Sequence, residues 1–285
     1  MAAVRRYLAE FLSDPRVVPL PRGIWLPLLN GFVLPVRSRR SARKYASIWT
    51  GEGSPLAVHT ARQAELLRRA LPAYDVRYAM RYGEPAIRSA LAGMQDPLVV
   101  PLYPQFAESA TGSVLALLPR DAQAIRDFHD HARYIEALAA NLRRHWRSRA
   151  RGEMLVMSFH GLPKRLAQEY EQQCRATAAL LARALALKDG EWRVTFQSRF
   201  GFAQWLQPYT QPTLVKLARA GVRRVDVVFP GFVADCLETL EEIGIVARRA
   251  FVQAGGTELR LVPCLNESPE WIEALAAMVS DRTSP

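Results

Sequence analysis

Cysteine is scarce in this sequence: Cys174, Cys236 and Cys264 are the three that occur, and no two of them form a CxxC pair. Scattered cysteines in odd number argue against a disulfide framework and a structural zinc site, and favour a reducing compartment. The sequence also lacks an apolar run of the about 20 residues that span a bilayer. Its start, "MAAVRRYLAEFL", has no uninterrupted apolar stretch of the kind found in signal peptides. We therefore expect a cytoplasmic protein.

Acidic residues are outnumbered, with 27 against 38 basic ones and a formal net charge of +11. This balance predicts anionic partners. The densest basic runs are "RSRRSARK" (Arg37–Lys44) and "RRHWRSRAR" (Arg143–Arg151). Binding of nucleic acid by stacking needs aromatic residues among the basic ones, and Trp146 alone provides one, so we expect no nucleic-acid partner. The runs are read as solvated helix ends and loops, although the first also suits an anionic lipid surface or ligand carboxylates.

Strand-like and helical patterns alternate along the chain, which is typical of parallel α/β sheets. Short apolar runs predict strands at Val76–Met80, Leu98–Leu102, Met154–Phe159, Val194–Phe196, Val225–Phe229 and Leu259–Val262. Helical periodicity predicts helices at residues 3–12, Ala61–Leu71, Pro85–Met94, Ala132–Trp146, Cys174–Leu187, Gln211–Ala220, Asp235–Ala254 and Pro269–Val279. At 285 residues the chain favours two domains, with a boundary near residue 128.

Two segments carry candidate chemistry at the carboxyl ends of predicted strands, where ligands bind in such sheets. His160 follows the strand Met154–Phe159, and "PGFVADCLE" follows Val225–Phe229. Asp235 and Glu238 have the spacing of a helix capping box. Glu238 and Glu242 lie four residues apart, on one helix face. A solvated acidic face accounts for this pattern, and so does a path for a divalent metal.

One imidazole and one carboxylate are too few ligands for a closed structural metal site, but both accept Fe²⁺. A neutral imidazole also accepts protons near pH 7. From spacing alone, however, a structural role for His160 remains the simpler reading.

The longer motifs, however, overturn that simpler reading. The segments "SFHGLPKR" (Ser158–Arg165), "FQSRFG" with "WLQPYT" (Phe196–Thr210), "PGFVADCLETLEEI" (Pro230–Ile243) and "VPCLNESPEWI" (Val262–Ile272) closely resemble ferrochelatase. So do "RRYLAEFLSDPRVV", "KYASIWTGEGSPL", "AMRYGEP" and "VPLYPQF", between Arg5 and Phe106. The motifs occur in order over nearly the whole chain and are most similar to the proteobacterial type.

The resemblance implies a chelatase fold: two Rossmann-like α/β domains, each with a parallel four-stranded sheet flanked by helices, and a porphyrin between them. We expect the first domain at residues 1–128, the second at 129–268, and a C-terminal helix in 269–285 that packs back on the first. The family's usual opening strand and "NLGTP"-like loop have no counterpart in the sequence. We therefore expect the first sheet to lack a strand.

The resemblance also implies insertion of Fe²⁺ into protoporphyrin IX, with release of two protons. By position it assigns His160 and Glu238 to catalysis and, with Glu242, to the metal. It assigns the following residues to porphyrin binding: Arg81, Tyr82, Tyr103, Gln105, Phe106, Ser198 and Trp205. Fe²⁺ is then a substrate, no resident cofactor is needed, and three cysteines exclude a four-ligand iron–sulfur cluster. Poorly soluble protoporphyrin suggests peripheral membrane contact.

Val246 stands where the family often continues its acidic ladder, which weakens the case for an outer metal position. With the absent strand, it motivates a second hypothesis, a non-catalytic or degenerate tetrapyrrole-binding protein. An unrelated α/β module that binds anions would be a third.

Overall fold

The computed structural model of the chain describes residues 2–201 and 203–283. Its C-terminal half contains a parallel sheet with the strand order β4-β3-β5-β6. The strands are β3 (Met154–His160), β4 (Trp192–Gln197), β5 (Arg224–Val228) and β6 (Glu258–Leu261). Each overlaps a strand predicted from the apolar runs, so this part of the fold is confirmed.

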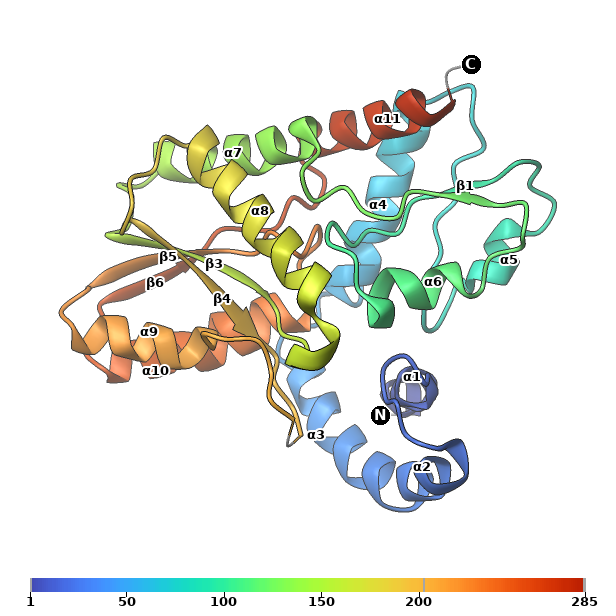
Figure 1. Cartoon of the computed structure of the whole chain (residues 1–285), viewed down its shortest axis with the longest axis horizontal. Helices are drawn as coiled ribbons and strands as arrows, with labels where there is room; N and C mark the ends of the chain where they lie inside the picture. The colour runs from blue at the N-terminus through green and yellow to red at the C-terminus, as the bar shows by residue number, and fades with distance from the viewer. Residues whose placement is uncertain (1, 202, 284–285) are drawn as a thin grey trace.

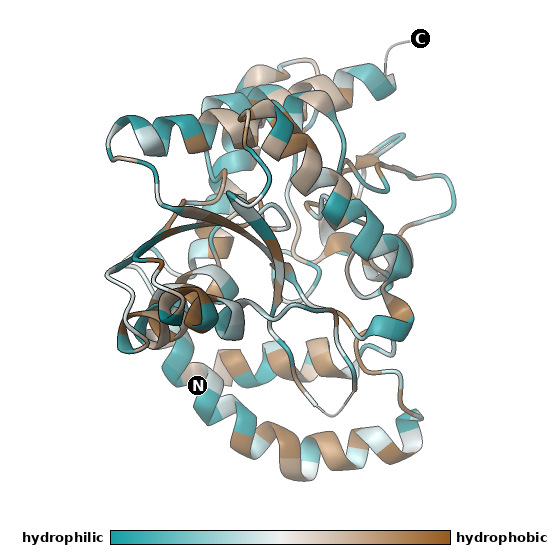
Figure 2. Ribbon diagram, turned by 60° about the vertical axis from the view of Figure 1, so that its left-hand side comes forward, coloured by the Kyte–Doolittle hydropathy of each residue, from teal (hydrophilic) through white to brown (hydrophobic). Residues whose placement is uncertain are grey.

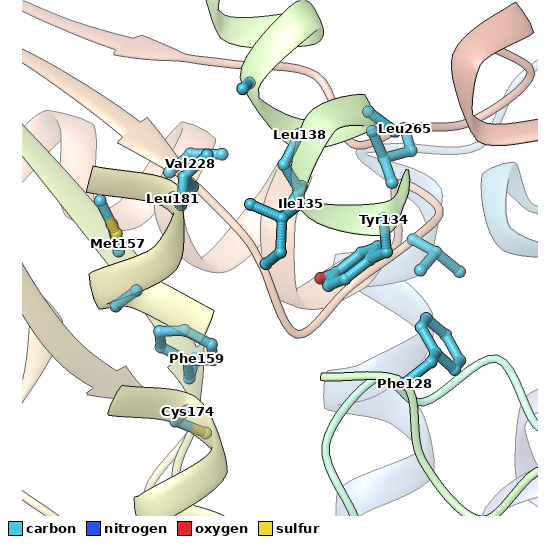
Figure 3. Packing of buried hydrophobic residues seen from close by; sticks show 14 of the residues in the cluster. Phe128, Tyr134, Ile135, Leu138, Met157, Phe159, Cys174, Leu181, Val228 and Leu265 are labelled. Atoms are coloured by element: carbon cyan, nitrogen blue, oxygen red, sulfur yellow. The ribbon is translucent and has the colours of Figure 1, made fainter. Parts of the chain in front are cut away.

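Both faces of this sheet are covered by helices, because alternate side chains of β3 are apolar in both directions. Leu155, Met157 and Phe159 belong to a core with α7 (Ala132–Arg147) and α8 (Gln168–Ala184). Figure 3 shows Met157 and Phe159 packed near Leu181 and Cys174 of α8. Met154 and Val156 belong to a second core with α9 (Thr210–Arg219) and α10 (Arg248–Gln253). In Figure 1 the sheet lies between these two helical layers.

The N-terminal half has a smaller sheet, in which β1 (Leu98–Val99) pairs in parallel with β2 (Gln123–Ala124). Its other elements are α4 (Pro55–Ala70), α5 (Ile87–Leu91), the π-helix η2 (Glu108–Gly112) and α6 (Ser113–Leu115). The last helix, α11 (Pro269–Thr283), packs against α4 of this half and α7 of the other (Figure 1). The domain limits themselves stay a prediction.

The expectation of a strand at Val76–Met80 is wrong. Within the described residues this segment makes a single bridge, between Met80 and Ala86. The segment and residues 97–102 both line a large cleft. Because a strand needs a hydrogen-bonded neighbour, the apolar run alone does not form one.

A helical arm, residues 2–46, extends beyond the two halves and was not expected beyond its first helix. It consists of α1 (Ala2–Ser13), α2 (Arg22–Leu28), a π-helical turn η1 (Leu29–Val33) and α3 (Leu34–Ala46). Leu8 and Leu12 of α1 pack on Leu29 and Leu34 in a small core of their own. In Figure 1 the arm lies below both halves.

Candidate active site

The carboxyl ends of β3 and β4 lie side by side, with His160 paired in register to Gln197. Gly161 follows at once, and its N–H donates to the Gln197 carbonyl over 2.8 Å. A Cβ atom at Gly161 would stand 2.7 Å from that carbonyl oxygen and 3.2 Å from the Trp205 ring. Close backbone approach at the sheet edge therefore requires glycine directly after His160.

His160 is half-buried and lines the cleft. Its Nδ1 lies 2.6 Å from the Gly161 carbonyl oxygen. Because a carbonyl oxygen accepts but cannot donate, Nδ1 carries the proton, and Nε2 of the neutral ring keeps its lone pair. The Tyr170 hydroxyl donates a hydrogen bond to the backbone carbonyl of His160 over 2.9 Å and so holds the backbone of this residue in place. The ring is thus oriented with Nε2 as its free base.

Glu238 begins a π-helix, η4 (Glu238–Ala247), and its side chain also lines the cleft. Gln197 Nε2 donates to the Glu238 carbonyl over 2.8 Å, which ties the start of η4 to the end of β4. The expected capping role of Asp235 is wrong, because in the described part of the chain no side-chain hydrogen bond caps η4. Asp235 instead accepts from Thr239 and from Asn266 Nδ2, so it holds the loop after β6.

Glu242 lies one turn further along η4, and Ser198 binds both of its carboxylate oxygens. The Ser198 N–H donates to Oε1 over 2.7 Å, and its hydroxyl donates to Oε2 over 2.6 Å. Burial raises the pKa of Glu242; the Ser198 hydrogen bonds and the nearby His160 oppose this, while Glu238 adds to it. Glu242 therefore shares the electrostatic environment of His160 and Glu238, although it is not among the residues that line the cleft.

No three His, Cys, Asp or Glu side chains form a metal-binding group anywhere in residues 2–201 and 203–283. The structure thus offers no preformed closed site. His160 and Glu238 both line one cleft and carry metal-donor atoms. Two such donors suit an ion that binds transiently and is then transferred to another ligand.

The cleft has a volume of about 1280 Å³. Common small-molecule sites measure about 300–1,000 Å³, so it has room for a large ligand. Its walls come from the arm, from α4 and α5, from residues 76–82 and 97–110, and from the sheet edge with His160. The lining is predominantly apolar. It also contains a few charged residues, which include Arg81, Arg165 and Glu238.

Arg81 and Tyr82 line the cleft and are anchored by the arm. Asp14 pairs with the Arg81 guanidinium and accepts from the Tyr82 hydroxyl over 3.0 Å. Burial raises the pKa of Tyr82 to about 12. Burial alone would raise the pKa of Asp14, but hydrogen bonds from Arg16 N–H, Ser113 and Tyr82, and the charge of Arg81, lower it instead. The arm therefore orders this wall of the cleft.

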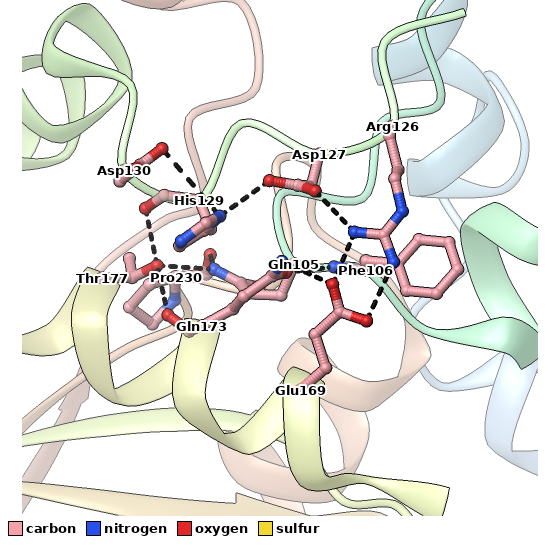
Figure 4. A network of polar contacts seen from close by, with 10 residues as sticks. All are labelled: Gln105, Phe106, Arg126, Asp127, His129, Asp130, Glu169, Gln173, Thr177 and Pro230. Atoms are coloured by element: carbon pink, nitrogen blue, oxygen red, sulfur yellow. Dashed lines mark hydrogen bonds and ion pairs between the residues drawn. The ribbon is translucent and has the colours of Figure 1, made fainter.

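The predicted residues of the "VPLYPQF" segment divide into two groups. Tyr103 faces the cleft; it is 36% exposed, yet the enclosing walls desolvate its hydroxyl and raise its pKa. Gln105 touches the cleft, but its Nε2 donates to Thr177 and to the Pro230 carbonyl (Figure 4). Phe106 is not among the lining residues, because Arg126 lies over its ring at 3.5 Å (Figure 4).

Of the two remaining residues predicted to bind the porphyrin, Trp205 lines the cleft and Ser198 does not. Trp205 lines the cleft at only 4% exposure, and its ring centroid lies 4.8 Å from that of Phe200. Its Nε1–H finds no acceptor in the described part of the chain. Ser198 is not among the lining residues and acts on Glu242 instead.

Tyr7 and Tyr45 were not expected near the site from the sequence. Burial raises the pKa of both hydroxyls, and the charge of Glu238 raises both further. Tyr7 lines the cleft together with Glu238. The rings of the two tyrosines meet edge to face, with centroids 6.3 Å apart. Lys44 adds a contact of the arm with η4, since its Nζ lies 2.8 Å from the buried carboxylate of Glu241. Both Lys44 and Tyr45 belong to the motif "KYASIWTGEGSPL", which was the available signal.

Comparison with known proteins agrees with this geometry. The sequence matches the family model "Ferrochelatase" over residues 1–283. It is 54% identical to the ferrochelatase of Azoarcus sp. over 298 residues, which cover 98% of this chain and 82% of that protein. It is 52% identical to the ferrochelatase of Polaromonas sp. over 295 residues, covering 96% and 80%.

Two solved structures share the fold. SirB from Bacillus subtilis with Fe³⁺ superposes with a TM-score of 0.60 at 15% identity, covering 81% of this chain and 92% of that one. CbiX, described as the terminal enzyme for biosynthesis of siroheme in denitrifying bacteria, gives 0.55 at 17% identity, covering 81% and 95%. At these identities the likeness concerns the fold alone.

Proposed function

The chain belongs to the ferrochelatase family, the lyases of the final step of heme biosynthesis, and from this premise we propose that its cleft inserts Fe²⁺ into protoporphyrin IX. The observation that carries the proposal is the presence of His160 and Glu238 in one apolar cleft of about 1280 Å³. The macrocycle would lie between the sheet edge and the wall that contains Arg81 and Tyr103. Insertion forms four Fe–N bonds and releases two pyrrole protons.

His160 is the proposed acceptor of a pyrrole proton. Its Nδ1–H is committed to the Gly161 carbonyl, which leaves Nε2 as the basic atom. An imidazole with one unprotonated ring nitrogen is a suitable general base.

Glu238 is the proposed ligand that receives Fe²⁺ and helps to remove its water. A carboxylate oxygen is an acceptable donor for Fe²⁺, and in an apolar cleft its attraction for a cation is stronger than in water. Glu242, held by Ser198, would supply negative charge one turn behind it. Because the ion leaves with the porphyrin, two protein donors suffice. We expect no resident cofactor.

Binding of the porphyrin is proposed to use the apolar walls for the ring and cationic groups for its carboxylates. Arg165 lines the cleft, is exposed, and has no acidic partner in the described residues. A guanidinium binds carboxylates in bidentate fashion. A macrocycle held in a bent form would favour the transition state over the flat substrate.

No helix within residues 2–201 and 203–283 is long and apolar enough to cross a membrane. We propose a cytoplasmic location with peripheral membrane contact. The three cysteines are free and buried, in keeping with a reducing compartment.

The test separates binding from chemistry. Protoporphyrin binding is measured by fluorescence quenching, and Fe²⁺ insertion by absorbance without oxygen, for the wild type, His160→Ala and Glu238→Gln. We expect insertion to fall at least 100-fold in both variants with porphyrin affinity within about threefold, since general base and metal contacts each contribute about 10²–10⁴. His131→Ala is the control, because His131 is half-buried and outside the cleft. Wild-type insertion rates in His160→Ala would refute the role of His160.

A further inference from the structure

The π-helix η4 carries three acidic side chains close together, Glu238, Glu241 and Glu242. Their surroundings differ. Glu238 lines the cleft, and Ser198 binds both carboxylate oxygens of Glu242. Glu241 is buried and is not among the residues that line the cleft. Carboxylates this close repel one another, and each of them attracts a divalent cation bound at Glu238.

The arm neutralises one of these three carboxylates. Lys44, in the last turn of α3, places its Nζ 2.8 Å from Oε2 of Glu241. Figure 2 shows the arm along the lower edge of the molecule, with its hydrophilic (teal) end below the helices of the C-terminal half. Within residues 2–201 and 203–283, Glu238 and Glu242 form no ion pair of this kind. The charge that η4 presents near the cleft therefore depends on Lys44.

We propose that the Lys44–Glu241 pair sets how tightly Fe²⁺ is held at Glu238, and so how readily the ion passes to the porphyrin. This inference rests on the proposed function. Neither Lys44 nor Glu241 lines the cleft, so both are positioning residues that act on the metal through Glu238.

The reason is electrostatic. An ion that must be transferred has to be bound strongly enough to lose water and weakly enough to leave. Without Lys44, the Glu241 carboxylate would add a full negative charge within one turn of Glu238. Charges at a partly buried site are screened only in part, so one such charge changes the affinity for a divalent cation by roughly tenfold or more.

The sign of the charge provides the test. Lys44→Met leaves the carboxylate without its cation, whereas Glu241→Gln leaves the ammonium without its anion. Binding of Fe²⁺ to the full chain is measured by equilibrium dialysis without porphyrin or oxygen. We expect Lys44→Met to bind Fe²⁺ about tenfold more tightly and Glu241→Gln about tenfold more weakly. The double variant, which restores the charge balance, should stay within about threefold of the wild type.

Steady-state insertion gives a second readout. For Lys44→Met, the KM for Fe²⁺ and kcat should both fall about tenfold, because an ion held more tightly in the ground state leaves more slowly. For Glu241→Gln, the KM for Fe²⁺ should rise about tenfold with little change in kcat. A contact that served the fold alone would shift both single variants in the same direction, because each of them breaks the same pair.

Two controls separate charge from packing. Arg43→Met removes the cation directly before Lys44; Arg43 is exposed and forms no ion pair in the described part of the chain. Solvent screens its charge, so Fe²⁺ affinity should stay within about twofold. Lys44→Arg retains the charge and should also stay close to the wild type. If Lys44→Met folds poorly, Glu241→Gln decides, because the Lys44 side chain is 42% exposed and water can solvate its freed amine.

The outcomes distinguish this inference from the proposed function. Shifts of the same sign in the two single variants, or Fe²⁺ affinities equal to that of the wild type, would overturn the role of the pair even if the wild type forms heme. Opposite shifts in Fe²⁺ affinity with no heme formed by the wild type would support the role of the pair in metal binding and refute the proposed function instead.

Discussion

Replacing Gly161 by Ala adds one methyl group at the point where His160 is positioned. The new Cβ would lie 2.7 Å from the Gln197 carbonyl oxygen, a backbone atom that cannot rotate away, and 3.2 Å from the Trp205 ring. The end of β3 must therefore move relative to β4. The backbone φ of Gly161 is not positive, so the effect is one of space and not of backbone strain.

The size of the effect follows from the contacts. Forcing a methyl group into a packed site costs about 1–3 kcal/mol. Weakening the hydrogen bond from Gly161 N–H to Gln197 removes about 0.5–1.5 kcal/mol more. In a domain of this size about 2–4 kcal/mol lowers the Tm by roughly 5–10 °C. A displacement of His160 by about 1 Å would lower kcat 10- to 100-fold.

Calorimetry and the insertion assay give the two readouts. Gly51→Ala is the matched control, because a Cβ there meets nothing within 4 Å. We expect the control to keep the wild-type Tm and kcat. A Gly161→Ala protein that matches this control in both would refute the argument that close approach at this edge positions His160.

Three further predictions concern the groups around the cleft. Asp14→Ala should lower the free energy of unfolding by about 3–5 kcal/mol in urea titrations, because it leaves the Arg81 charge without its buried partner. The control Asp121→Ala, at an exposed position, should change the free energy of unfolding little. Equal effects of the two substitutions would contradict the reasoning. Since the folded state lowers the pKa of Asp14, its contribution is present above the ordinary carboxyl pKa and is lost as the pH falls through the folded pKa. The stability difference between wild type and Asp14→Asn should therefore shrink on acidification, and a difference that stays constant with pH would exclude this linkage. Ser198→Ala should raise the pKa of Glu242 further, because it removes a hydrogen bond that opposes the effect of burial; NMR titration of the Glu242 carboxyl tests this, and an unchanged pKa would rule it out.

The second sheet could be predicted from the sequence because its signals are local. The apolar runs around Met157 and Val227 are bounded by turns, and both strands are buried on two faces. The same logic placed His160 at a carboxyl edge beside the segment with Glu238. What periodicity could not supply was the role of His160, which came from the resemblance of whole motifs.

The arm was missed because its sequence contains helix breakers. Pro27 lies inside α2, Gly31 lies in the π turn, and Pro35 lies at the start of α3. Proline removes a backbone donor and is read as a boundary. Here Pro35 occupies the first turn, where no donor is needed, and packing on α1 compensates for the rest.

Other differences arise from contacts between distant segments. Ser198 and Glu242 are 44 positions apart, and Lys44 and Glu241 are 197 apart. No pattern within a window of 20 residues contains such pairs. Val76–Met80 fails in the opposite sense: its composition favours a strand, but within residues 2–201 and 203–283 it forms only the bridge between Met80 and Ala86.

The central claim is that the cleft with His160 and Glu238 inserts iron. The most direct measurement is a single-turnover reaction of wild-type protein with Fe²⁺ and protoporphyrin IX in the absence of oxygen, in which heme absorbance and proton release are recorded together. The account predicts one heme and two protons for each Fe²⁺ consumed. Quenching of porphyrin fluorescence with no heme formed by the folded protein would contradict it, and would instead support a tetrapyrrole-binding protein without catalysis.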